Sequence, residues 1–287
     1  DRGVSIEGGK RIRFGDELSA GITGSILWDD AWRSRTEQRN TFIPLGDGSL
    51  RSNDSCTIER TTRTVGLSGF LTGGVNWADL HELNLTSMML RQTEDEITSQ
   101  VGFNLDEDGI IKINQLEWQE RQLIANQAEG RHVFPVLNGA RIEWDYSESR
   151  ANLDTPDTRR YRFDPDEEAG FIFSRRADSN VRRFTNLDDR AVDFGGDLVV
   201  PFSIADGLFA GELSGGYRSL EKNRQSFIRR FTFEDISNLT FEERRQHSLE
   251  EIFTPDNIGP DGAALLEITR NTDTYSASLD VEAFFGN

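Results

Sequence analysis

Residues 18–30, with the sequence LSAGITGSILWDD, alternate between apolar and polar side chains and decide the fold class. The apolar or small members of one parity are Leu18, Ala20, Ile22, Gly24, Ile26 and Trp28. Successive side chains of a β-strand point to opposite faces of the sheet, so a period of two is typical of a half-apolar strand. The stretch therefore predicts a strand with one apolar and one polar face.

Other segments show the same alternation. The clearest are residues 192–202, 209–217 and 275–285, and the weaker ones are residues 61–72, 81–94, 110–134 and 140–162. Together with the first segment they predict an all-β fold of about eight long antiparallel strands that run up and down along the chain.

Short turn signals alternate with longer, charged connections. We expect tight turns at residues 73–76, 136–139 and 205–207, and long loops at residues 45–55, 95–109, 164–179 and 234–271. Short turns on one rim and long loops on the other are typical of transmembrane β-barrels of the outer membrane. Within the last loop, Thr240–Glu243 predicts the capping box of a short helix whose apolar side is formed by Phe241, Leu249 and Ile252.

The composition excludes several classes of protein. Among 287 residues, 32 are Lys or Arg and 50 are Asp or Glu, and the net charge of −18 argues against a nucleic-acid partner. The longest apolar runs, such as residues 198–200 and 263–266, are far shorter than the ~20 residues of a membrane-spanning helix. Cys56 is the only cysteine, so no intrachain disulfide can form, and we expect it to be an inert thiol in a loop.

The two parities suit two different surroundings. Hydrocarbon cannot solvate charge, so in a membrane barrel the apolar parity contacts lipid and the polar parity faces a wet lumen. Aromatic residues toward the strand ends predict a girdle at the membrane surface: Trp28, Trp32, Trp144, Tyr146, Tyr217 and Phe285. The alternative is that these aromatic side chains form the core of a soluble β-sandwich.

Two parts of the chain resemble a known family. Residues 118–123 (WQERQL) and 127–134 (QAEGRHVF), continued by residues 142–147 (IEWDYS) and 156–163 (PDTRRYRF), resemble a mid-barrel hairpin of the TonB-dependent outer-membrane receptors. Residues 252–259 (IFTPDNIG) and 273–278 (DTYSAS) are similar to an extracellular loop and the next strand of the same family.

The resemblance implies a function and a location. Residues 1–287 would be part of the receptor β-barrel domain, with the plug domain and the closing strands absent. Such receptors import a scarce nutrient (a siderophore, a cobalamin or an oligosaccharide) across the outer membrane of Gram-negative bacteria. The TonB complex supplies the energy through an N-terminal part of the receptor, and the barrel meets membrane lipid and lipopolysaccharide. We expect ligand contacts, if any, in residues 164–179 and 234–271.

No group of residues predicts catalysis, a cofactor or a metal, so we do not expect an enzyme. His81, His132 and His247 lack a metal-ligand spacing. Residues 106–109 resemble a calcium loop only faintly, because the other ligands are missing, and we expect a solvated turn there. Residues 164–168 are likewise expected to be a solvated loop, and no substrate-binding residue is nominated.

Five arginine pairs lie at or near the expected loops. They are Arg159-Arg160, Arg175-Arg176, Arg182-Arg183, Arg229-Arg230 and Arg244-Arg245. Their guanidinium groups suit anionic siderophores or lipopolysaccharide phosphates, but the favoured interpretation is that they balance neighbouring acidic residues. Two other functions stay open: a soluble β-sandwich or propeller that binds or hydrolyses carbohydrate, and a passive porin or adhesin barrel.

Overall fold

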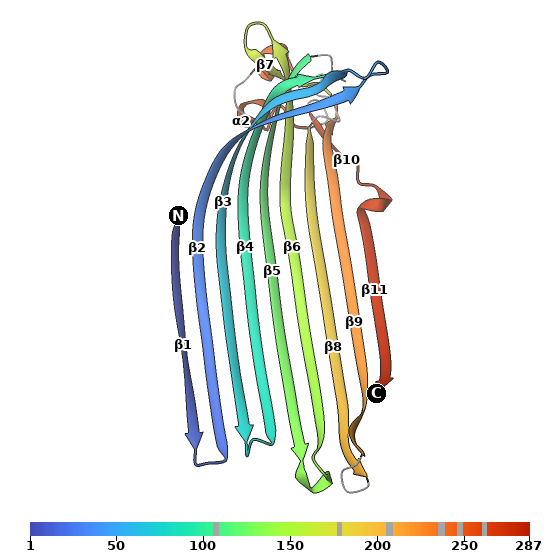
Figure 1. The fold of residues 1–287 in the computed structure, drawn as a ribbon. Helices are drawn as coiled ribbons and strands as arrows, with labels where there is room; N and C mark the ends of the chain where they lie inside the picture. Colours follow the sequence, from blue (N-terminus) through green and yellow to red (C-terminus); the bar gives the residue numbers. More distant parts are fainter. Residues whose placement is uncertain (106–108, 177–179, 205–208, 235–238, 246–248, 260–262) are drawn as a thin grey trace.

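A single antiparallel sheet forms the body of the protein in the computed structural model (Figure 1). The structure describes residues 1–105, 109–176, 180–204, 209–234, 239–245, 249–259 and 263–287. The long strands are β1 (Arg2–Phe14), β2 (Leu18–Pro44), β3 (Leu50–Trp77), β4 (His81–Asn104), β5 (Gly109–Phe134), β6 (Ala140–Asp166), β8 (Val181–Ile204), β9 (Phe209–Glu234) and β11 (Thr274–Gly286). Two short strands, β7 (Gly170–Phe173) and β10 (Ala264–Glu267), extend its upper end.

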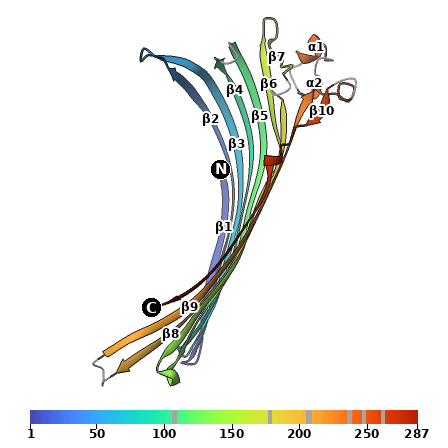
Figure 2. The same ribbon diagram turned by 90° about the vertical axis from the view of Figure 1, so that its right-hand side faces the viewer.

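The strands pair almost entirely in chain order. From β1 to β6 each strand pairs with the next, β6 continues to β8 and β9, and β9 pairs with β10 near its upper end and with β11 along its middle. Figure 2 shows this sheet edge-on as one curved layer, which is not closed into a barrel. The all-β, up-and-down antiparallel prediction is confirmed, but the sheet has 11 strands instead of about eight. The sequence prediction omitted β1 and the two short strands β7 and β10, which lie in segments predicted to be loops.

The lower ends of the strands, as Figure 1 shows them, are joined by short turns. The turn at residues 136–139 is confirmed by η1 (Pro135–Leu137), which ends at Asn138 with a φ of 58°. The turn predicted at residues 73–76 is wrong, because β3 continues to Trp77 and the chain reverses at Ala78 and Asp79, with φ values of 54° and 55°. The turn predicted at residues 205–207 lies outside the described residues.

Two of the predicted long loops are mostly strand. β2 and β3 continue to a turn at residues 45–49, where Leu45 N–H donates to the carbonyl of Ser49 at 2.8 Å, and β4 continues to Asn104. Polar pairs join the strands there, such as Gln38 Nε2 donating to Thr57 Oγ1 at 2.8 Å. The predicted strict alternation of tight turns and long loops is therefore wrong, because these strands stay paired where neither face is apolar.

The pairing register assigns every side chain to one of two faces. The apolar face carries the parity of Ile22, and the polar face carries the parity of Thr23. In the lower part of the sheet, an apolar band covers the apolar face; among its members Ile6, Ile22, Leu85 and Leu213 are 72%, 55%, 54% and 63% exposed. No second layer among the described residues covers this band.

The upper edge of the apolar band crosses the strands obliquely. On β2 the band extends from Leu18 to Trp28, which is about 33 Å of strand. A row perpendicular to the strands leads from Trp28 to Gln225 of β9, yet the highest aromatic residue of the band on β9 is Tyr217. Tyr217 is eight residues below Gln225, which is about 26 Å along β9, and β9 lies six strand spacings from β2, which is about 29 Å across the sheet. The upper edge of the band is therefore inclined by about 40° to the perpendicular row.

β11 differs from the other long strands. Its apolar parity, which includes Leu279 and Val281, lies opposite Lys222 and Leu220 on the polar face. The expectation that every strand turns its apolar parity to the same face is therefore wrong for β11. β11 pairs with β9 mostly above Tyr217, beyond the upper edge of the apolar band. The band therefore does not determine to which face β11 turns its apolar side chains.

A cap lies at the top of the sheet, to one side of it (Figure 2). It contains β7, α1 (Phe241–Arg244), α2 (Leu249–Ile252), β10 and η4 (Asn271–Asp273). Its buried core is formed by Tyr161, Phe173, Phe233, Leu239, Ile252 and Ala263. The capping box is confirmed, since Thr240 Oγ1 accepts from Glu243 N–H at 3.2 Å and Thr240 N–H donates to Glu243 Oε2 at 2.7 Å. Phe241 is exposed and stacks on Arg245, so it does not share the apolar side of Ile252.

Candidate functional site

Acidic residues gather on the lower part of the polar face around Arg218 of β9. Arg218 Nη1 lies 2.8 Å from Asp145 Oδ1 and 4.0 Å from Asp193 Oδ1, and its Nη2 lies 3.8 Å from Asp197 Oδ2. The guanidinium covers Gly195, where a Cβ atom would lie 2.5 Å from Arg218 Cζ. One cation thus meets three carboxylates, and we call this group the acidic cluster.

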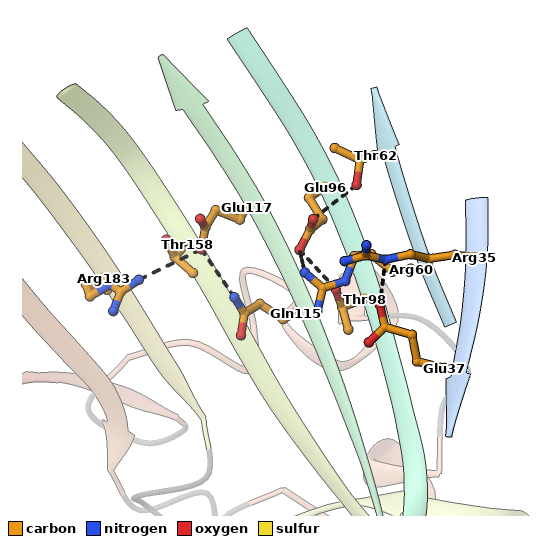
Figure 3. A network of polar contacts seen from close by, with 10 residues as sticks. All are labelled: Arg35, Glu37, Arg60, Thr62, Glu96, Thr98, Gln115, Glu117, Thr158 and Arg183. Carbon is orange, nitrogen blue, oxygen red and sulfur yellow. Dashed lines mark hydrogen bonds and ion pairs between the residues drawn. The ribbon is translucent and has the colours of Figure 1, made fainter. Parts of the chain in front are cut away.

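A charged network crosses the polar face at a higher level (Figure 3). Glu96 of β4 and Glu117 of β5 lie directly opposite each other in its centre. Arg60 Nη1 donates to Glu96 Oε1 at 2.9 Å, and Thr62 Oγ1 donates to Glu96 Oε2 at 3.0 Å. Directly opposed like charges destabilise a sheet, and the hydrogen bonds from Arg60 and Thr62 offset this repulsion.

Glu117 has its own set of partners in the network. Gln115 Nε2 and Thr158 Oγ1 donate to Glu117 Oε2 at 3.2 and 3.4 Å, and Arg183 Nη2 lies 3.8 Å from the same oxygen. The Nε atoms of Arg60 and Arg183 are buried and have no hydrogen-bond partner within the described part of the chain. Because a buried unsatisfied donor costs ~1–3 kcal/mol, the network has donor capacity that an added acceptor would use favourably.

Asp157 joins two arginines near the cap. Arg182 Nη2 and Arg159 Nε each donate to Asp157 Oδ2 at 2.6 Å. Partial burial acts to raise the pKa of the Asp157 carboxyl, but the hydrogen bonds from Arg182 and Arg159 outweigh it and hold this pKa below its ordinary value. Burial raises the pKa of the nearby Tyr161 hydroxyl. The Asp157 carboxyl is therefore ionised at neutral pH and accepts hydrogen bonds from both arginines.

The structure brings together two histidines that are distant in sequence. His81 begins β4 and His132 lies near the end of β5, and their Nδ1 atoms are 3.3 Å apart. Trp144 covers Gly130 and donates from Nε1 to His132 Nε2 at 3.2 Å. The two histidines lie at the lower edge of the apolar face, and His247 lies outside the described residues. The sequence could have indicated this pair, because an antiparallel hairpin that pairs Asn104 with Gly109 also places residues 81 and 132 opposite each other.

Most residues of the arginine pairs contact carboxylates, as the favoured interpretation expected. These ion pairs are Arg159 and Arg182 with Asp157, Arg183 with Glu117, Arg229 with Glu267, Arg230 with Asp273, and Arg245 with Asp166 and Glu168. Arg244 is buried, and its guanidinium lies 5.9 Å from the centre of the Phe241 ring. Contacts of these arginines with siderophores or lipopolysaccharide stay a prediction.

Two other predictions need correction. Asp166 is not simply solvated: its Oδ1 accepts the N–H groups of Ala169 and Glu168 at 2.8 and 3.1 Å, and the Ala169 N–H is the main reason why its pKa is lowered. Cys56 lies in β3 and is buried instead of being in a loop. Residues 106–108, in the expected solvated turn, lie outside the described residues.

Of the charged network, only Arg183 was singled out in the sequence, as a member of an arginine pair; its partner Glu117 and the contacts around Glu96 were not predicted, because only the register shows which polar side chains meet. Within the described ranges no group of three or more His, Cys, Asp or Glu is placed to hold a metal ion. No helix in the described part of the chain is long and apolar enough to cross a membrane. Searches found no matching family model, curated protein or solved structure.

Proposed function

We propose that this chain forms part of the wall of an outer-membrane β-barrel in a TonB-dependent receptor that imports a scarce nutrient. The observation that carries the proposal is the oblique apolar band. Its edge crosses the strands at about 40°, and strands of membrane barrels tilt by about 35–45° from the membrane normal. An apolar zone parallel to a membrane therefore requires such an edge.

The height of the apolar band agrees with this interpretation. About 33 Å of strand tilted by about 40° gives a zone close to the ~25 Å apolar height of outer-membrane barrels. Trp28, Tyr146 and Tyr217 lie at its upper edge, and Trp77 lies at its lower edge on β3. Aromatic side chains at both edges are expected at the two membrane surfaces.

The receptor assignment rests on further support. The polar face carries the acidic cluster and the charged network, which suit a water-filled lumen. The strands continue far above the apolar band to the cap, where a ligand would first meet the protein. The resemblance of residues 118–163 to a receptor hairpin favours nutrient import driven by TonB over passive diffusion.

A pair of substitutions tests the membrane wall in the full-length protein that contains this chain. Ile22→Arg places a charge in the middle of the apolar band, and the adjacent Thr23→Arg places it on the polar face. We expect Ile22→Arg to lower the free energy of unfolding in lipid bilayers by ~2–4 kcal/mol, and Thr23→Arg to have a much smaller effect. Urea unfolding in vesicles followed by tryptophan fluorescence measures both.

The opposite result would support a soluble β-protein. If Ile22→Arg and Thr23→Arg behave alike, and the protein is monomeric in water without detergent, the apolar band does not contact lipid. A passive porin is distinguished by vesicles that contain the full-length protein. Rapid swelling in glucose would indicate an open pore, whereas a plugged receptor gives none.

A further inference from the structure

An apolar patch interrupts the polar face between the acidic cluster and the charged network. It consists of Leu90 of β4, Leu123 of β5, Leu153 of β6 and Leu187 of β8, and we call it the leucine patch. Leu90 lies opposite Leu123, and Leu153 lies opposite Leu187, so all four share the polar face. They line a groove of about 570 Å³.

The leucine patch is not explained by the apolar band, because the band occupies the opposite face. Leu90 is 43% exposed although every strand that flanks it is in place. Exposed apolar surface favours a partner, since each Å² removed from water contributes about 25 cal/mol. The leucine patch therefore gives the groove an apolar surface on which the apolar part of a ligand can pack.

Arg121 supplies a charge at the edge of this apolar surface. It lines the groove, is exposed, and lies opposite Leu153 in the register. Arg91 and Arg150, on the apolar face of the neighbouring strands, are 2.7 and 2.6 Å from the carboxylates of Glu120 and Asp188. No such ion pair or hydrogen bond joins Arg121 to any other residue that the structure describes.

The remaining charge on the polar side of the groove is distant from Arg121. Asp29 lines the groove from β2, three strands away, and its carboxylate covers Gly66. Gln92 lies between them and adds an amide. The groove is thus acidic at its β2 end and basic beside the leucines, which fixes the direction in which an anion would lie.

We propose that the leucine patch and Arg121 form a binding site for an amphipathic anion. Its alkyl or aryl body packs on Leu90, Leu123, Leu153 and Leu187, and its carboxylate accepts two hydrogen bonds from the Arg121 guanidinium. The free guanidinium and the apolar surface complement the two ends of such a molecule. The site requires only that the polar face is open to water, so it does not depend on the proposed transport function.

Calorimetric titration of the full-length protein, held in an amphipathic polymer, tests the site with octanoate and its uncharged analogue octanamide. Arg121→Gln removes the charge, Leu123→Asn disrupts the apolar surface of the groove, and Arg150→Gln is the matched control, because Arg150 lies on the opposite face and does not line the groove. Thermal unfolding of each variant shows whether its fold is preserved.

We expect Arg121→Gln to weaken octanoate binding about tenfold and to leave octanamide binding unchanged, because only octanoate carries the charge. We expect Leu123→Asn to weaken the binding of both probes and Arg150→Gln to weaken the binding of neither. The proposal is overturned if the unmodified protein binds octanoate without saturation or not at all, which would mean that another part of the protein covers the patch. Equal octanoate affinity in Arg121→Gln would overturn it too. None of these outcomes affects the test with Ile22 and Thr23.

Discussion

The cap and the apolar band place apolar side chains in opposite ways. In the cap, Phe173 and Ile252 are 0% exposed, whereas Ile22 and Leu213 in the band are 55% and 63% exposed. A core of the first kind forms because water is expelled from between packed side chains. The second arrangement is favourable only where the surroundings are themselves apolar. This contrast is the basis of the proposed membrane wall, in which the apolar band would contact hydrocarbon while the cap core excludes water.

The largest expected effect comes from emptying the cap core. Phe173→Ala removes a ring that packs on Phe163 and Phe253 with ring centres 5.7 and 5.3 Å away, and we expect a loss of ~3–5 kcal/mol in cap stability. Hydrogen exchange should accelerate in β7 and β10 but not in the lower half of β2. The partly exposed Phe171 gives the control Phe171→Ala, with a smaller effect. Faster exchange throughout the sheet would contradict a separate cap core.

A smaller effect is expected in the apolar band at Gly130. Trp144 lies over Gly130, where an added Cβ atom would be 2.3 Å from the indole, so Gly130→Ala must displace the ring and its hydrogen bond to His132. We expect a loss of ~1–3 kcal/mol in unfolding free energy and a shifted tryptophan emission.

Gly196 is the matched control for Gly130, because it lies on the other side of Trp144 in the same row and a Cβ atom there has no neighbour within 4 Å. Gly196→Ala should leave both the stability and the emission nearly unchanged. Equal losses from the two alanine variants would show that Trp144 does not need the space above Gly130.

The smallest expected effect is a pH dependence in the cap. The pKa of Glu267 in β10 is lowered from 4.5 to about 2, first by its hydrogen bond from Arg229 and then by one from Thr269. Because the folded pKa is below the unfolded one, the ionised carboxylate stabilises the pairing of β10 with β9 above about pH 4.5. This contribution is lost as the pH falls toward about 2.

Urea unfolding of the cap between pH 6 and pH 2 measures this dependence. In Glu267→Gln the free energy of cap unfolding should depend less steeply on pH than in the unmodified protein. The stability of the apolar band should differ little between the variant and the unmodified protein. A slope that is identical in Glu267→Gln and the unmodified protein would show that Arg229 and Glu267 do not stabilise the cap.

The sequence predicted strands well wherever the two faces of the sheet differ. Residues 18–30 and 209–217 alternate because one parity is apolar, and both are strands in the structure. The upper parts of β2 and β3 carry polar residues on both faces, so no period of two indicates them. The glycines at 73 and 74 resemble a turn signal, but Gly74 makes room for the Asn84 side chain, whose Oδ1 would lie 2.3 Å from an added Cβ atom.

The candidate sites were less accessible from the sequence than the strands. Glu96 and Glu117 meet only through the register of β4 with β5, and Arg183 reaches Glu117 across a register shift between Thr155 and Thr158. No local pattern encodes such a shift. The unpaired state of Arg121 is likewise a property of its neighbours on other strands, so it becomes visible only when all of them are placed.

The order of the strands has a consequence for how the protein folds. Because nearly every strand pairs with its neighbour in the chain, the sheet can grow by adding one hairpin at a time, and each step closes only a short loop. The pairing of β9 with β11 is different, since four elements of the cap (α1, α2, β10 and η4) lie between these two strands in the chain. Closing this longer connection costs more chain entropy than closing a tight hairpin, so we expect the pairing of β9 with β11 to be a slow step of assembly.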